Sequence, residues 1–203
     1  MEPQFWRDRW AEGKTAFHEG KPNSFLTQFL ARMTGKRVLV PLCGKADDLS
    51  YLASEGREVV GIELVEDAVK AFFDEHSLTP TVDGNRYTAG PITLIASDIF
   101  AIDRKQLGTI DAIYDRAALV ALPPDLRPRY VAHLRAAVAD TVPGLLVSIE
   151  YPQERMEGPP FSVPETEVRT YYPKAQLLAE QPLTSGRAAE LGVAIERCYS
   201  VTW

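Results

Sequence analysis

Cysteine and histidine are scarce in this chain, with two Cys and three His among 203 residues. Cys43 and Cys198 lie far apart, and no cluster of metal-ligating residues accompanies them. A disulfide-stapled secreted scaffold and a Cys/His metal centre are therefore excluded as the basis of the fold. We expect two free thiols, no metal, and a reducing compartment, the cytoplasm.

Long apolar runs and an excess of positive charge are also missing. No uninterrupted apolar stretch approaches the roughly 20 residues of a membrane-spanning helix, and the opening Met-Glu-Pro-Gln-Phe-Trp is not the basic-then-apolar pattern of a signal peptide. The formal net charge is −6, which repels phosphate backbones and anionic membrane surfaces. We therefore expect a small-molecule substrate, with no nucleic-acid or membrane partner.

The length and the 45% hydrophobic content suit one well-buried domain and are too small for two. We expect a single domain over residues 1–203 that is stable as a monomer. Its first part, residues 1–22, is polar but carries Trp6, Trp10 and Phe17. A segment that is too polar for the core and unusually aromatic for a tail is expected to fold back as a lid.

Apolar strands alternate with amphipathic helices through most of the chain. Strands are expected at 37–41, 58–62, 92–96, 111–115 and 145–151, and helices at 23–33, 46–54, 65–76 and from Pro123 to Val138. Turn signals predict a hairpin within 79–91, and the Pro-rich segment 152–164 predicts a cover over a site. The last run, 193–203, is expected to pair with a strand near 182–186. The pattern predicts an α/β, Rossmann-like doubly wound sheet, mostly parallel, with a C-terminal antiparallel strand pair.

The segment KRVLVPLCGK at 36–45, followed about twenty residues later by VVGIE at 59–63, describes a nucleotide-binding βαβ unit. Glu63, at the end of the second strand, is placed to accept hydrogen bonds from ribose hydroxyls. Gly44 is the one glycine of the turn, whereas dinucleotide binders need several glycines for the pyrophosphate to approach the backbone. S-adenosylmethionine, which has no phosphate, fits this turn better than NAD.

Ligands of such sheets bind beyond the carboxyl ends of the strands. Four consecutive predicted strands end in turn or polar residues there: Leu42 to Gly44, Glu63, Ser97 to Phe100, and Asp115 with Arg116. The Asp98 carboxylate can accept a hydrogen bond from the adenine amine, and Ile99 with Phe100 can sandwich the ring.

These residues also have structural interpretations. Glu63 could be a favourable charge at a helix N-terminus, and Asp98 could cap a turn. Cys43 is interpreted as a small packing residue, because it has no catalytic partner in the sequence. Arg116 could pair with Asp115, but its place at a strand end favours the pocket.

Three blocks, in the same order along the chain, resemble the thiopurine S-methyltransferases. They are WRDRW with GKTAFH in residues 6–18, VPLCGK at 40–45, and DRAALVAL at 115–122. The resemblance covers nearly the whole chain and implies a class I methyltransferase fold and S-adenosylmethionine as the cofactor, with S-adenosylhomocysteine as product. It also implies methyl transfer to the sulfur of small aromatic or heterocyclic thiols.

The resemblance implies a role for each matching residue. Cofactor contacts are expected from Trp6, Trp10, Leu42, Gly44, Glu63, Asp98, Ile99 and Arg116. Contacts with the methyl acceptor are expected from Phe17, Arg116 and Arg187, and Arg116 is the catalytic candidate. S-methyl transfer requires alignment and exclusion of water more than a general base, which agrees with the absence of a histidine at the predicted strand ends.

Alternatives remain open at this point. The same fold could methylate selenium or tellurium oxyanions, a halide or another small thiol metabolite. An NAD-dependent oxidoreductase and a non-catalytic sensor of an adenosine ligand are alternatives of a different class. The single-glycine turn disfavours the first of these two, and Arg116 with the aromatic lid disfavours the second.

Overall fold

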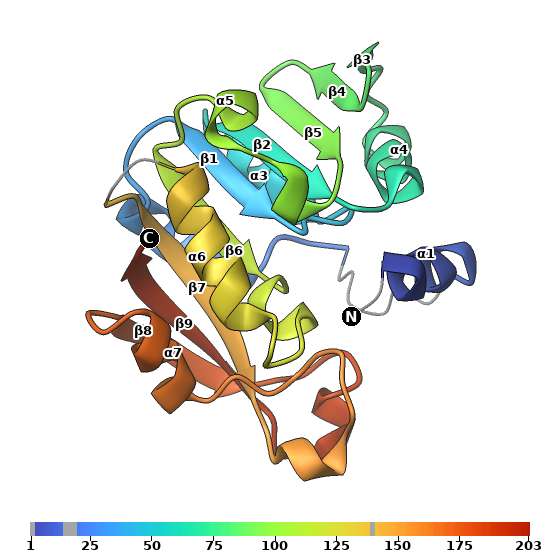
Figure 1. The fold of residues 1–203 in the computed structure, drawn as a ribbon. Helices are drawn as coiled ribbons and strands as arrows, with labels where there is room; N and C mark the ends of the chain where they lie inside the picture. The colour runs from blue at the N-terminus through green and yellow to red at the C-terminus, as the bar shows by residue number, and fades with distance from the viewer. Residues whose placement is uncertain (1–2, 14–19, 139–140) are drawn as a thin grey trace.

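The computed structural model describes residues 3–13, 20–138 and 141–203 (Figure 1). Its helices are α1 (Pro3–Ala11), α2 (Ser24–Phe29), α3 (Asp47–Ser54), α4 (Glu66–Glu75), α5 (Arg104–Leu107), α6 (Arg127–Ala137) and α7 (Glu165–Tyr171). Its strands are β1 (Arg37–Pro41), β2 (Glu58–Glu63), β3 (Thr81–Asp83), β4 (Arg86–Ala89), β5 (Ile92–Ala96), β6 (Ala112–Arg116), β7 (Pro143–Glu150), β8 (Gln176–Pro182) and β9 (Ile195–Thr202).

The strands form one sheet in the order β3-β4-β5-β2-β1-β6-β7-β9-β8. The central strands β5, β2, β1, β6 and β7 are parallel. The hairpin β3–β4 and the strands β9 and β8 add antiparallel edges. The predicted doubly wound sheet with its C-terminal antiparallel pair is confirmed. The strand order changes direction between β1 and β6, which opens a crevice at the carboxyl ends of these strands.

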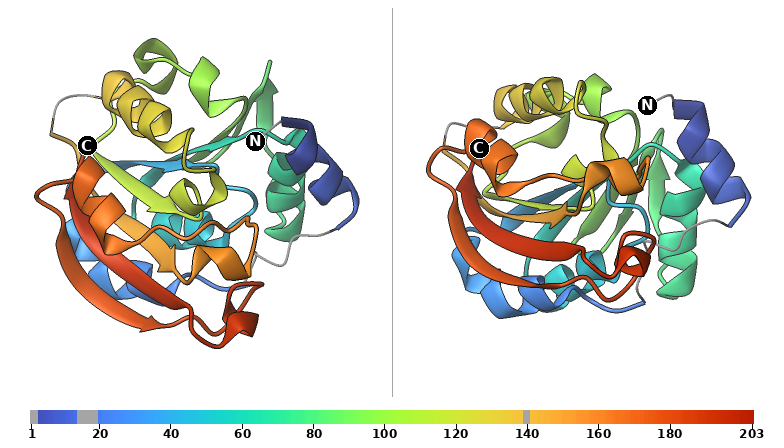
Figure 2. Two further views of the ribbon diagram at one scale, coloured as in Figure 1. Left: turned by 60° about the horizontal axis from the view of Figure 1, so that its bottom comes forward. Right: turned by 90° about the horizontal axis from the view of Figure 1, so that it is seen from below.

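Helices cover both faces of the sheet, so the molecule has three layers (Figure 2). On one face, α5, α6 and α7 bury apolar residues such as Leu107, Leu134 and Val168. On the other, α2, α3 and α4 bury aromatic and aliphatic side chains, including Leu26 and Phe72. The central strands β1, β2 and β6 are buried on both faces, because helices cover each face there. This double covering holds the carboxyl ends of the parallel strands rigidly side by side.

The predicted elements mostly match the structure, and two of them are corrected. Residues 37–41 and 92–96 are strands with the expected bounds, and the hairpin within 79–91 is present. The partner of the last strand is β8, which ends at Pro182, so the prediction of 182–186 was wrong. Helix α6 begins at Arg127 and not at the Pro123-Pro124 pair, because Pro128 occupies its first turn while the preceding residues form turns.

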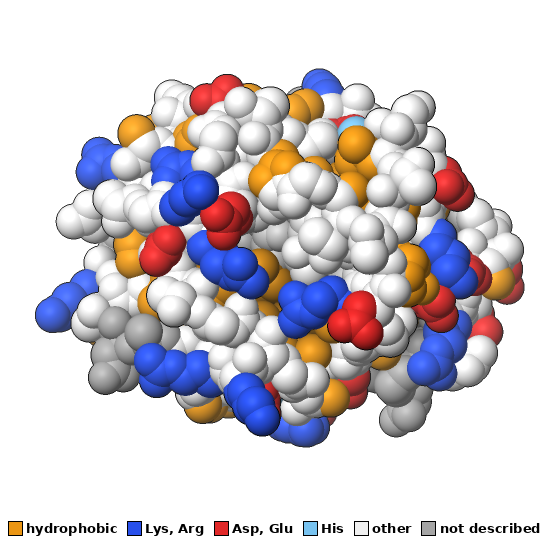
Figure 3. Space-filling model, turned by 90° about the horizontal axis from the view of Figure 1, so that it is seen from above, with side chains coloured by type: hydrophobic (Ala, Val, Ile, Leu, Met, Phe, Trp, Pro, Cys, Tyr) orange, Lys and Arg blue, Asp and Glu red, His pale blue; other side chains and the backbone are white. Residues whose placement is uncertain are grey.

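Figure 3 shows the face at the amino ends of the parallel strands, where Lys and Arg side chains stand among Asp and Glu. Lys36 and Arg37 both pair there with Glu58, at 2.8 and 3.5 Å. Such exposed pairs contribute little to stability, because water and salt screen them.

Candidate active site

A cavity of about 740 Å³ opens at the carboxyl ends of the parallel strands. Every predicted site residue that the structure describes lines it: Trp6, Trp10, Leu42, Gly44, Glu63, Asp98, Ile99, Arg116 and Arg187. Phe17, the other predicted residue, lies outside the described residues. Segments far apart in the sequence therefore meet at the strand ends, where the topology predicts a ligand.

The turn after β1 forms one wall of the cavity. Leu42 and Gly44 both have positive φ, 48° and 52°. This conformation is strained for leucine, and such strain is found mainly where a surrounding site maintains it. Gly61 of β2 permits the turn to pack closely, because a Cβ there would lie 2.7 Å from Cys43 Sγ. Cys43 is thus a buried packing residue, and burial raises the pKa of its thiol.

Glu63 holds this turn and faces the cavity at the same time. One carboxylate oxygen accepts from the Gly44 N–H at 2.9 Å and the other from the Val65 N–H at 2.8 Å. The residue is only 7% exposed. Burial raises the pKa of Glu63, and its backbone hydrogen bonds oppose that shift. A carboxylate oxygen has more than one lone pair, so Glu63 can also accept from hydroxyl groups in the cavity.

The segment after β5 forms the next wall. The Asp98 side chain caps a short 3-10 turn by accepting from the Phe100 N–H at 2.9 Å. Ile99 is buried, and the Arg129 guanidinium covers one face of the Phe100 ring, 4.0 Å from its centroid. Asp98 is exposed at the cavity. The capping role that the sequence left open for Asp98 is therefore present, together with its place in the cavity wall.

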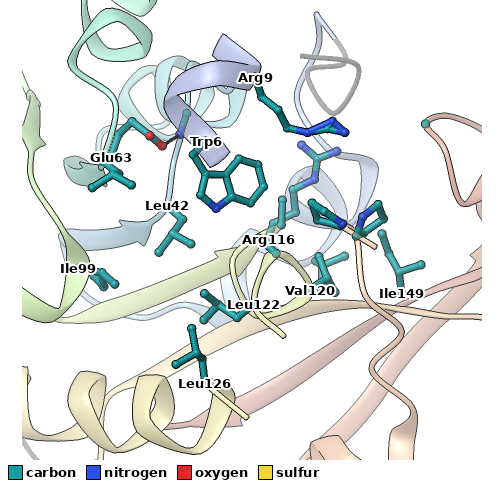
Figure 4. A pocket seen from close by; sticks show the side chains of 18 of the residues that line it. Trp6, Arg9, Leu42, Glu63, Ile99, Arg116, Val120, Leu122, Leu126 and Ile149 are labelled. Atoms are coloured by element: carbon teal, nitrogen blue, oxygen red, sulfur yellow. Dashed lines mark hydrogen bonds between the residues drawn. The ribbon is translucent and has the colours of Figure 1, made fainter. Parts of the chain in front are cut away.

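Helix α1 contributes the aromatic wall. Trp6, Arg9 and Trp10 line the cavity, and the Trp6 indole projects between Glu63 with Leu42 on one side and Arg116 on the other (Figure 4). Arg9 points toward the same region as Arg116 (Figure 4).

The opposite half of the cavity is apolar with cationic groups at its border. Its apolar lining comes from Val120, Ala121, Leu122, Leu126, Val147, Ile149, Pro159, Pro160, Leu183 and Ala188. Arg116, at the end of β6, has a side chain that is 13% exposed. Arg187 donates to the Pro159 carbonyl at 3.0 Å, which joins the C-terminal segment to the Pro-rich loop 152–164. Pro159 and Pro160 of that loop, which was predicted as a cover, form part of the cavity wall.

Asp115 shapes the cavity from behind. It is fully buried, accepts from the Leu119 N–H at 3.1 Å and from the Tyr130 hydroxyl at 2.9 Å, and so holds the turn that carries Val120. Ala117 in this turn has a φ of 64°, a second strained residue in the lining. The structural interpretation of the sequence, in which Arg116 pairs with Asp115, is therefore wrong. Asp115 instead positions the turn.

Burial raises the pKa of Asp115 from 3.8 to about 6, which predicts a pH-dependent stability. The folded state holds the Asp115 proton more tightly than the unfolded state does. Below pH 3.8 the protonated side chain therefore contributes its full amount, about 3 kcal/mol, to the free energy of unfolding. This contribution is lost as the pH rises through about 6. In urea unfolding, Asp115→Asn should become more stable relative to wild type by about this amount between pH 4 and 7. The same pH dependence in both proteins would contradict the assignment, and Asp103→Asn, on the surface at α5, is the control.

Carboxylates and arginines both line the cavity. Glu63 and Asp98 lie at the ends of β2 and β5, where Arg129 covers the Phe100 ring. Arg116 and Arg187 lie beside the apolar lining, together with Glu196 of β9. Carboxylates suit the hydroxyl and amino groups of an adenosine, and arginines beside an apolar wall suit a flat ligand with a negative charge. The lining thus fits an S-adenosyl group in one half and an acceptor in the other.

Several lining residues were not predicted from the sequence: Asp125, Leu126, Arg129, Val147, Ile149, Leu183, Ser185 and Glu196. Most belong to elements other than the strand ends used for prediction. The inward alternation of β7 was the signal for Val147 and Ile149. Among the described residues there is no cluster of His, Cys, Asp and Glu placed to hold a metal ion. None of the helices described is both long and apolar enough to cross a membrane.

The family model of thiopurine S-methyltransferase (TPMT) matches residues 1–195. The chain is 49% identical over 179 residues to a thiopurine S-methyltransferase of Pseudomonas aeruginosa (strain UCBPP-PA14), a match covering 85% of this chain and 82% of that protein. It is 47% identical over 180 residues to a thiopurine S-methyltransferase of Xanthobacter autotrophicus, a match that covers 85% of this chain and 84% of that protein.

Solved structures support the fold. A methyltransferase from Anabaena variabilis superimposes with a TM-score of 0.67 at 15% identity, covering 98% of this chain and 94% of the other. Magnesium protoporphyrin IX methyltransferase from Synechocystis, solved with S-adenosylhomocysteine, gives 0.64 at 14% identity, covering 98% of both chains. With the family model spanning nearly the whole sequence, the chain belongs to the thiopurine S-methyltransferase family, and it is an S-adenosylmethionine-dependent methyltransferase with the class I fold.

Proposed function

We propose that this protein transfers a methyl group from S-adenosylmethionine to the sulfur of small aromatic or heterocyclic thiols, including thiopurines. The observation that carries the proposal is that one cavity holds Glu63 and Asp98 at the ends of β2 and β5, and Arg116 and Arg187 beside an apolar wall. The family membership adds the reaction class. Acidic thiols populate the thiolate near neutral pH, and arginines stabilise that anion.

The residues of the chain have distinct parts in this proposal. Glu63 binds ribose hydroxyls, Asp98 accepts from the adenine amine, and Ile99 with Phe100 holds the adenine ring. When bound, S-adenosylmethionine supplies an electrophilic methyl group. Arg116 holds the acceptor sulfur as an anion and orients it, while the apolar wall excludes water. In this proposal Arg187 is a second cation facing the acceptor.

We also propose that residues 1–22 act as a lid on a single domain that works as a monomer in the cytoplasm. The position of Trp6 and Trp10 in the cavity wall supports the lid. The two cysteines are both buried and unpaired with each other, which suits a reducing compartment.

The acceptor is tested by transfer of labelled methyl from S-adenosylmethionine to a panel of 6-mercaptopurine, an aryl thiol, an aliphatic thiol, selenite, tellurite and iodide. Rapid labelling of the aromatic and heterocyclic thiols is expected. Labelling of selenite, tellurite or iodide alone would assign the acceptor pocket to that nucleophile and contradict the proposal. Glu63→Ala serves as the control. This variant should lose S-adenosylhomocysteine binding, and with it the labelling of every acceptor, because transfer requires an intact cofactor half.

Replacing Trp10 with alanine tests the lid. An indole over a sulfonium contributes about 0.5–2 kcal/mol through cation–π attraction, so Trp10→Ala should weaken S-adenosylmethionine binding about 2- to 30-fold and lower turnover. Isothermal titration calorimetry and the methyl-transfer assay measure these effects. Arg7→Ala, on the exposed side of α1, is the matched control. Unchanged affinity and turnover in Trp10→Ala would show that α1 is not a lid.

A further inference from the structure

Two carboxylates without a part in the proposed reaction are buried next to the acceptor half of the cavity. Asp48, in the first turn of α3, is 1% exposed, and Glu196, on β9, is 5% exposed and lines the cavity. An ionised carboxylate is costly to bury unless its partners compensate. The partners of these two residues therefore indicate what they do.

Asn23 joins the two carboxylates. Its backbone N–H donates to Asp48 Oδ1 at 2.7 Å, and its side-chain Nδ2 donates to Glu196 Oε1 at 3.2 Å. Its own Oδ1 accepts from the Phe25 N–H at 2.9 Å and so caps α2. The second Glu196 oxygen accepts from Gln181 at 3.0 Å. Because Asn23 is itself buried, this arrangement holds Asp48 in one orientation.

The other oxygen of Asp48 faces Arg116. Asp48 Oδ2 accepts from the Tyr114 hydroxyl at 3.1 Å and lies 4.0 Å from Arg116 Nη1. At that separation the two groups form an ion pair, so the Asp48 charge attracts the guanidinium. Burial, and then the charge of Asp48, raise the pKa of Tyr114, which keeps its hydroxyl a donor.

The sheet register brings the other carboxylate to the same side. Arg116 lies opposite Val147 of β7, and Val147 lies opposite Cys198 of β9. Glu196 is two residues from Cys198 along β9, and alternate residues of a strand share a face. Arg116, Val147 and Glu196 therefore project from one face of the sheet, and all three line the cavity.

We propose that Asp48 is a positioning residue for Arg116, holding its guanidinium at the acceptor half of the cavity before the substrate binds. An arginine side chain is long and flexible, and a fixed anion beside it reduces the ordering that the reaction would otherwise require. The inference rests on the proposed role of Arg116. It adds Asp48 of α3 to the residues that act on the acceptor, and Asn23, the N-cap of α2, as the residue that orients Asp48.

A double-mutant cycle tests the proposal in the full-length protein. Asp48→Asn keeps the shape and an acceptor for the Asn23 N–H but removes the charge. With 6-mercaptopurine we expect it to lower kcat at least tenfold while the Kd of S-adenosylhomocysteine stays within twofold. In an Arg116→Ala background the same change should lower kcat less than twofold, because there is no guanidinium left to position. Asp47→Asn, next in sequence and outside the cavity lining, is the control.

A second variant covers the case in which Asp48→Asn does not fold, as judged by circular dichroism and S-adenosylhomocysteine binding. Tyr114→Phe removes one hydrogen bond to Asp48 and leaves its charge, so we expect a smaller loss of kcat that again disappears without Arg116. An equal loss in both backgrounds, or no loss, would overturn the positioning role. If the Arg116→Ala variant alone has the kcat of the wild type, the proposed role of Arg116 in holding the acceptor is wrong. That outcome is distinct from a failure of the positioning role of Asp48.

Discussion

Replacing Glu63 with alanine is expected to raise the Kd of S-adenosylhomocysteine at least about a hundredfold. Hydrogen bonds to a charged group contribute about 1.5–3 kcal/mol each, and the variant loses those proposed to the ribose. It also loses the acceptors of the Gly44 and Val65 N–H groups, so the turn that carries Leu42 loses its support. Isothermal titration calorimetry measures the affinity.

Glu66→Ala is the matched control for Glu63. Glu66 begins α4 and pairs with Tyr87 and Lys70 outside the cavity lining, so its removal should leave the Kd unchanged. An affinity of Glu63→Ala within about threefold of wild type would contradict the ribose assignment. Since Glu63 also holds the turn, circular dichroism should establish that the variant is folded.

Replacing Arg116 with alanine is expected to lower kcat with aromatic thiols at least about a hundredfold, with the Kd of S-adenosylhomocysteine changed less than fivefold. The guanidinium favours the thiolate, so its loss raises the pKa of the bound thiol, and the rate of the variant should recover as the pH rises. Arg116→Lys keeps the charge but not the planar donor geometry and should be intermediate. Steady-state methyl transfer at several pH values measures both effects.

Arg135→Ala provides the control for a lost arginine, because Arg135 lies on α6 and donates to the Tyr171 carbonyl away from the cavity. Its turnover should match wild type. Equal losses of cofactor affinity and of turnover in Arg116→Ala would indicate a binding role and no specific effect on the acceptor.

The local pattern of the chain was sufficient for the central part of the fold. The apolar run of β1, the Gly44 turn and the second run ending at Glu63 specify a parallel βαβ unit, because hydrophobic periodicity and turn residues act over short distances. The helix predicted from residue 23 is present as α2, and Asn23 caps it by accepting from the Phe25 N–H. The sequence was less informative for β8, because that strand is half exposed and its pairing with β9 depends on contacts across the sheet.

Part of the candidate site was likewise predictable from the sequence, and part of it was not. Glu63, Asp98 and Arg116 were predictable because each follows a strand, and parallel strands end at one edge. Three contacts were not predictable, since they link residues distant in sequence: Arg129 over Phe100, the hydrogen bond from Arg187 to Pro159, and the joining of Asp48 to Glu196 through Asn23. By itself, the sequence determined the strand-and-helix order, the cofactor turn and the family. The tertiary structure decided which side chains face the acceptor and which carboxylates are buried beside Arg116, because only packing brings those segments together.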